Sequence, residues 1–148
     1  MEFNSYKITD VLKHTYYEVP QKLFEIPIYK NKLNSNSKLL YAFLLDRLKL
    51  SQKNNWCDEE KNVYLIFTRK EVEEKLNLNE KTVTKSFKQL REVNLIKEKK
   101  QGMGKPNLIY IGKVKDVEIQ EKSDNLKTNF KNSKIYGYWH GKFTGNQY

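Results

Sequence analysis

The stretch that decides the fold is residues 68–112, which read TRKEVEEKLNLNEKTVTKSFKQLREVNLIKEKKQGMGKPNLIYIG. It opens with a helix-start signal, because Thr68 is followed three residues later by Glu71. In such a capping box the hydroxyl and the carboxylate pair with backbone amides that the start of a helix leaves free. We therefore predict a helix from Thr68 to about Leu76.

A second helix is predicted over residues 79–92, after the short turn Asn77-Leu78-Asn79, with Asn79 as its N-cap. Val83, Phe87 and Leu90 follow the i, i+4, i+7 spacing that places apolar side chains on one inner face. Asn94 suits the left-handed conformation that ends a helix. Two helices joined by about three residues are typical of a helix-turn-helix, whose second helix enters the major groove of DNA.

Two strands are predicted after this helix pair, over Ile96–Gln101 and Leu108–Gly112. The turn at 102–107 contains glycine and proline, so the strands form a β-hairpin. The hairpin carries four lysines against a single acid, Glu98. Its glycines allow the backbone to approach a phosphate or to enter a minor groove.

Upstream lies a strongly apolar helix, because nine of the twelve residues from Leu39 to Leu50 are apolar. The polar residues 34–37 offer its N-cap. A helix that is apolar on nearly every side is either the central helix of the core or carries a second face for a partner subunit. Residues 63–67 (Val-Tyr-Leu-Ile-Phe) predict a strand.

The N-terminal part is predicted as a short element around Thr9–Val19, followed by an extended arm through Ile28. Pro20 and Pro27 interrupt any long helix in this part.

The order of these elements predicts an α+β fold, mainly helical: a winged helix-turn-helix with a basic β-hairpin wing. We expect three regions along the chain. Residues 1–34 form an N-terminal arm and a dimer contact, residues 35–112 form the DNA-binding domain, and residues 113–148 form a linker or tail leading to a C-terminal domain beyond this chain.

The charge of the chain points to a polyanion ligand. The 148 residues contain 28 basic and 18 acidic side chains, a net charge of +10. Residues 68–112 hold eleven of the basic and six of the acidic residues, so half of the excess lies on the helix pair and the hairpin. A localised basic surface is what nucleic acid binding requires, although an ordinary solvated surface also carries lysines.

Candidate DNA-binding residues follow from the predicted faces. Lysine pairs with phosphates or guanine, and threonine and glutamine contact base edges. In the second helix the candidates are Asn79, Lys81, Thr82, Thr84, Lys85, Lys88 and Gln89. In the wing they are Lys97, Lys99, Lys100, Gln101, Lys105 and Asn107, and Thr68, Arg69 and Lys70 are expected at the DNA backbone. The simpler alternatives are an amphipathic surface helix and an edge strand protected by lysines.

Catalytic and metal-dependent functions find little support in the sequence. With one cysteine and the two isolated histidines His14 and His140, the chain lacks the ligands of a usual structural zinc site. The segment Gly102–Lys105 lacks the spacing of a phosphate loop, and Pro106 stands where such a loop has a magnesium-binding hydroxyl. We expect no enzyme activity, no cofactor, no membrane contact, and a cytoplasmic location.

Several longer stretches resemble a known family. They are Val19–Phe24, Leu39–Arg47, Leu50–Trp56, Asp58–Glu60, Val63–Arg69 and Gly104–Tyr110. Together they resemble the N-terminal domain of the replication-initiator A family of plasmids from low-GC Gram-positive bacteria, over roughly residues 16–112. Lys61 departs from the pattern, because the family tends to have glycine there.

The resemblance implies a function as well as a fold. It implies binding of repeated origin sites (iterons) in double-stranded DNA, initiation of theta-type replication without nicking, and action as a homodimer. It also implies that host replication proteins are contacted by a C-terminal domain outside this chain, which would then be the N-terminal piece of a longer protein. Two alternatives remain open at this stage: a winged-helix transcriptional repressor, and an adaptor whose basic face meets an acidic protein.

Overall fold

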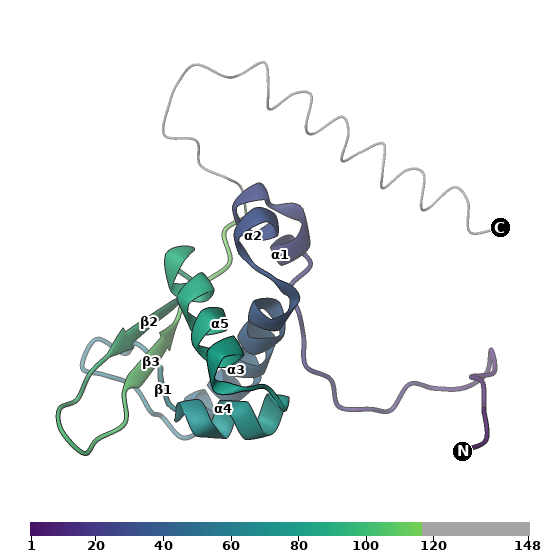
Figure 1. Ribbon diagram of the computed structural model, residues 1–148. Helices are drawn as coiled ribbons and strands as arrows, with labels where there is room; N and C mark the ends of the chain where they lie inside the picture. Colours follow the sequence, from purple (N-terminus) through teal and green to yellow (C-terminus); the bar gives the residue numbers. More distant parts are fainter. Residues whose placement is uncertain (117–148) are drawn as a thin grey trace. The chain divides into compact units, whose positions relative to one another are not determined.

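A computed structural model of the protein describes residues 1–116 and contains a bundle of helices beside a small antiparallel sheet (Figure 1). Most of the predicted linker, residues 117–148, lies outside the described part. The elements in chain order are α1 (Lys22–Glu25), α2 (Pro27–Lys32), α3 (Ser35–Lys53), β1 (Tyr64–Ile66), α4 (Arg69–Leu76), α5 (Glu80–Glu92), β2 (Ile96–Lys99) and β3 (Leu108–Ile111). This is the predicted α+β fold, a winged helix-turn-helix in which β2 and β3 form the wing.

The helix α3 lies at the centre of the core and is longer than the predicted 39–50. It begins after Asn34, whose side-chain oxygen accepts a hydrogen bond from the Ser37 amide at 2.9 Å. Residues 40–44 are all buried. The helix packs against α5, β1 and β3, which supports the first of the two interpretations of its apolar surface.

The helix-turn-helix forms as predicted. Thr68 and Glu71 make both hydrogen bonds of the capping box at the start of α4. Asn77 adopts the left-handed conformation with φ 51°, which ends α4 and turns the chain. Asn79 then caps α5 by accepting a hydrogen bond from the Thr82 amide at 2.8 Å.

The wing is joined to the core by a third strand. The sheet has the order β1-β3-β2, and both pairs are antiparallel. Ile109 on the central strand faces Leu65 on one side and Glu98 on the other. Side chains of directly paired residues share one face of a sheet, so Glu98 lies on the inward face with the buried Leu65 and Ile109.

Gly112, at the end of the hairpin, lies against Asn94 and Leu95, which follow α5. Its amide donates to the Leu95 carbonyl at 2.8 Å, and its own carbonyl accepts from the Tyr41 hydroxyl at 2.7 Å. A Cβ at this position would lie 2.3 Å from the Asn94 carbonyl oxygen, so only glycine fits. Burial raises the pKa of the Tyr41 hydroxyl to about 12, so the phenol stays protonated and can donate this bond.

The prediction for the N-terminal part was wrong in two places. Residues 9–19 contain no helix or strand, and residues 22–32 are not extended but form α1 and α2. As predicted, no long helix forms around Pro27: α1 ends at Glu25, and Pro27 occupies the first turn of α2, where the missing N–H is not needed. Leu23 and Tyr29 are buried and attach these two short helices to the core.

Residues 113–116 pack onto the same short helices. Val114 contacts the core, and the Lys115 amide donates to the Tyr29 hydroxyl at 3.1 Å. Lys22 and Asp116 form an ion pair. None of the helices in residues 1–116 is both long and apolar enough to cross a membrane.

Candidate nucleic-acid interface

The outward face of α5 brings together most of the residues predicted for the second helix. Lys81, Thr84, Lys85 and Lys88 are exposed and line one open, shallow hollow, with Glu80 beside them. On the opposite face Val83, Phe87 and Leu90 are buried, as their spacing predicted. The helix therefore presents three ammonium groups and one hydroxyl in a single row to solvent.

At the start of α5 two of the predicted residues form the N-cap: Asn79 contributes its side-chain oxygen and Thr82 its backbone amide. The Asn79 oxygen is occupied by the Thr82 amide, and the Thr82 carbonyl accepts a hydrogen bond from Ser86 Oγ at 2.8 Å. Both side chains stay at the N-terminal end of the helix, where the helix dipole favours anions. Glu80 was not among the predicted residues, and it adds an acid to the same first turn.

Gln89 does not join this face. Its Oε1 accepts hydrogen bonds from the Asn34 amide at 3.0 Å and from the Ser37 hydroxyl. The side chain thus joins α5 to the start of α3. The helical period placed Gln89 at the flank, but only the packing of α3 shows to which side it turns.

The wing lysines fall into two groups. Lys97 and Lys99 pair with Tyr110 and Leu108, so they stand on the outer face of the sheet. The exposed Lys100 and Lys105 lie in the loop nearer the tip.

The loop itself is shaped by local contacts. Gly102 and Gly104 have φ values of 116° and 77°, a region that favours glycine. Gln101 Nε2 donates to the Pro106 carbonyl at 2.7 Å and closes the base of the loop.

Arg69 was predicted at the DNA backbone, yet its guanidinium is paired with Glu98 within the domain, and 39% of the side chain is exposed. Nη2 lies 3.0 Å from Glu98 Oε1, and the guanidinium carbon lies 3.7 Å from the centroid of the Phe87 ring. The pKa of Arg69 is lowered, chiefly by partial burial of the guanidinium. The nearby Glu98 carboxylate acts in the opposite direction and offsets only part of this effect. The neighbouring Lys70 is exposed and forms no hydrogen bond or ion pair with any residue of 1–116.

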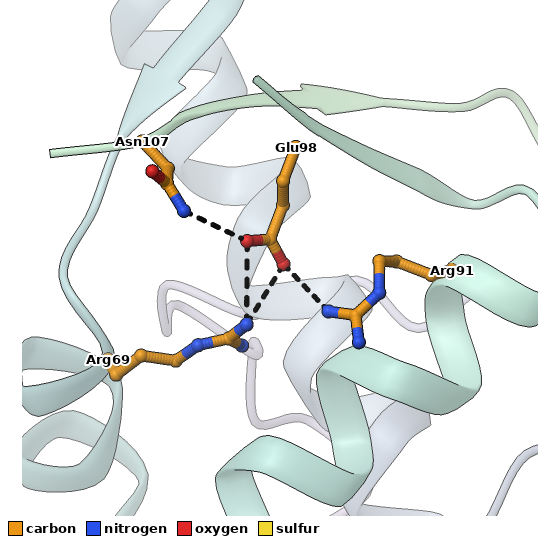
Figure 2. A network of polar contacts seen from close by, with 4 residues as sticks. All are labelled: Arg69, Arg91, Glu98 and Asn107. Atoms are coloured by element: carbon orange, nitrogen blue, oxygen red, sulfur yellow. Dashed lines mark hydrogen bonds and ion pairs between the residues drawn. The ribbon is translucent and has the colours of Figure 1, made fainter. Parts of the chain in front are cut away.

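Glu98 is the centre of a polar network that the sequence interpretation missed (Figure 2). Its carboxylate also contacts Arg91 Nη1 at 3.0 Å and Asn107 Nδ2 at 3.4 Å. Asn107 was predicted to contact DNA, and here it donates to Glu98. The alternation of the strand could have placed Glu98 inward, but its partners come from three other segments.

The sequence profile of the replication initiator protein A (RepA) N-terminus matches residues 15–127. The chain belongs to this family. Lys61, the departure from the family pattern, has a φ of 68°. A glycine adopts this conformation without the strain that a side chain brings, which accounts for the glycine that the family tends to have there.

Three solved structures resemble this RepA N-terminal domain. One is described as the N-terminal domain of a DNA-binding protein, with a TM-score of 0.66 and 31% identity over 91% of this chain and 96% of that one. A Rep–DNA complex has a TM-score of 0.66 and 35% identity over 78% and 88% of the two chains. An MDR initiator has a TM-score of 0.62 and 36% identity over 82% and 89%.

A curated relative is a "41 kDa protein" of Lactobacillus helveticus, 29% identical over 102 residues. The match covers 69% of this chain and 29% of that protein. The RepA N-terminal domain described here therefore corresponds to under a third of the length of that relative.

Proposed function

We propose that this domain binds double-stranded DNA at a plasmid replication origin and reads repeated sites there. The observation that carries the proposal is the row of Lys81, Thr84, Lys85 and Lys88 on the second helix of a helix-turn-helix. The family and the relative solved with DNA support the same assignment. The domain acts by binding, and we assign it no catalytic step.

The expected docking places α5 in the major groove with its outward row toward the bases. Lysines pair with phosphates or with guanine acceptors, and Thr84 is suited to a polar base edge or a thymine methyl. The wing then lies beside the adjacent backbone or minor groove, where Lys100 and Lys105 meet phosphates. Lys70 is the exposed cation at the start of α4. Arg69 and Gln89 are left out of the interface, because their side chains already serve contacts within the domain.

Selection of bound duplexes from a random DNA pool tests this function. We expect the selected sequences to share one motif, and we expect a plasmid origin that carries it to show direct repeats protected in a footprint. A single palindromic operator would instead indicate a repressor. Equal, weak and fully salt-suppressed binding to all duplexes would contradict sequence-specific recognition and favour the protein adaptor.

Within the predicted N-terminal arm of residues 1–34, the exposed part, residues 1–18, is proposed as the contact of a homodimer. Every residue of this part is exposed, and large apolar side chains recur along it: Met1, Phe3, Tyr6, Ile8, Val11, Leu12, Tyr16 and Tyr17. It holds two lysines against three acids, so it does not suit a phosphate backbone. Apolar and nearly neutral, this part suits a protein surface, and we assign it to a second copy of this chain.

Light scattering tests the dimer. Without DNA the full chain is expected to show about twice its mass of 17.7 kDa, and with a selected duplex it is expected to show two chains in addition to the mass of the DNA. A variant lacking residues 1–18 is expected to show the mass of one chain. A protein mass of one chain in both conditions, after the mass of the duplex is subtracted, would contradict the dimer.

Contacts with host replication proteins, made in the cytoplasm by a C-terminal region beyond this chain, are a further part of the proposal.

A further inference from the structure

Glu98 is an acid within the basic hairpin that is assigned to DNA. It is the single acidic residue of the hairpin, and a carboxylate near phosphates weakens DNA binding by repulsion. Its side chain is only 14% exposed and lies on the inward face of β2, beside Ile109. A role in solubility therefore does not account for it.

The carboxylate joins the wing to both helices of the helix-turn-helix. Arg69, the first residue of α4, contacts Oε1 at 3.0 Å and Oε2 at 3.4 Å. Arg91, near the end of α5, contacts Oε1 at 3.0 Å. Asn107, just before β3, donates to Oε2 at 3.4 Å, so both sides of the hairpin loop are included (Figure 2).

The arginine side of this network is itself held in place. The Arg69 guanidinium stacks on Phe87, which is 1% exposed and belongs to the inner face of α5. A charge-assisted contact with a planar guanidinium restricts direction as well as distance. The base of the wing is thus fixed relative to the helix that carries Lys81, Lys85 and Lys88.

The two strands of the wing are also held by β1 and by the buried Ile96 and Ile109, but the loop between them has few ties to the rest of the domain. Met103 at the tip is fully exposed, and Gln101 and Pro106 bond only to each other across the loop. The angle at the base therefore determines where Lys100 and Lys105 lie relative to α5. An interface that is already rigid loses less conformational entropy on binding than a mobile one, and it therefore binds more tightly.

We propose that Glu98 is a positioning residue, which fixes the wing against α5 so that helix and wing reach the same duplex together. The inference rests on the proposed function. It makes a prediction opposite in sign to simple electrostatics: removal of this negative charge weakens specific DNA binding.

The test is Glu98→Gln, assayed by fluorescence anisotropy on a duplex selected with the unchanged chain and on a random duplex. We expect affinity for the selected duplex to fall about tenfold, while affinity for the random duplex is unchanged or rises. The slope of log affinity against log salt concentration is expected to become shallower by about 0.9 for each wing lysine that no longer meets a phosphate. The matched control is Glu92→Gln, an exposed acid on α5 that pairs with no residue of 1–116 and should keep the specific affinity.

Limited trypsin digestion without DNA provides a second measurement. In Glu98→Gln, cleavage after Lys100 should accelerate several-fold relative to cleavage after Lys53 and Lys75, because only the wing is released. Uniform acceleration at all sites would show general unfolding and contradict positioning. Unchanged or stronger binding of Glu98→Gln to the selected duplex would also overturn the inference. A lack of specific binding by the unchanged chain would overturn the proposed function instead.

Discussion

Replacing Lys81, Lys85 and Lys88 together by alanine is expected to abolish specific DNA binding and to leave the fold intact. The three ammonium groups stand in one exposed row, and none forms an ion pair with any residue of 1–116. Their loss removes no interaction from the core. If each contacts one phosphate, the salt slope should become shallower by about 2.7, at 0.9 for each contact. Anisotropy over a range of salt concentrations measures both affinity and slope.

A control with the same change of charge separates position from total charge. Lys30, Lys32 and Lys53 are exposed on α2 and at the end of α3, outside the helix pair and the wing. Their joint replacement by alanine should retain specific binding, with at most a modest loss from long-range attraction. Equal losses in the two triple variants, or an unchanged gel shift with the α5 variant, would contradict the assignment of α5 as the reading helix.

Phe87→Ala is expected to cost the largest amount of stability, about 3–5 kcal/mol. The ring is 1% exposed on the inner face of α5, and the Arg69 guanidinium stacks on it. Its removal leaves a cavity between α5 and the wing and takes the stacking partner from a half-buried cation. A domain of this size has about 5–15 kcal/mol of stability in total, so the variant should lose a large part of it. Urea unfolding followed by circular dichroism measures the change.

The control for this prediction is Phe3→Ala. Phe3 is 91% exposed in the N-terminal arm, so the same chemical change there should shift the unfolding midpoint very little. The slope of the unfolding free energy against urea should stay the same in both variants if the transition remains two-state. A loss below about 1 kcal/mol in Phe87→Ala would show that the site collapses around the missing ring, against the close packing described here.

The helix pair and the hairpin could be predicted because their signals lie within a few residues of one another. The capping box spans Thr68 to Glu71, and the Asn79 cap acts on Thr82. Glycines mark the turn of the wing. Such contacts form wherever the local backbone adopts the conformation, so they can be read from spacing alone. The outward row on α5 follows in the same way from the helical period.

The same local rules failed where one residue type has two uses. Pro27 was taken only as an interruption of long helices and the chain through Ile28 as extended, but a proline also fits the first turn of a helix, which Pro27 occupies in α2. The choice was made by burial of Leu23 and Tyr29 against the core. No pattern of period or capping in residues 20–32 was strong enough to show that.

What the sequence by itself determined is therefore the order and the faces of the elements: the capped helix pair, the basic row on its second helix, and a lysine-rich hairpin after it. Only the tertiary structure decided which polar side chains remain free to meet DNA. Gln89 turns to residues 52 and 55 positions away, and Arg69 to a carboxylate 29 positions away. The physical reason is that charge and periodicity describe what a side chain can bind, whereas its partner depends on which distant segment the packed core brings within hydrogen-bond distance.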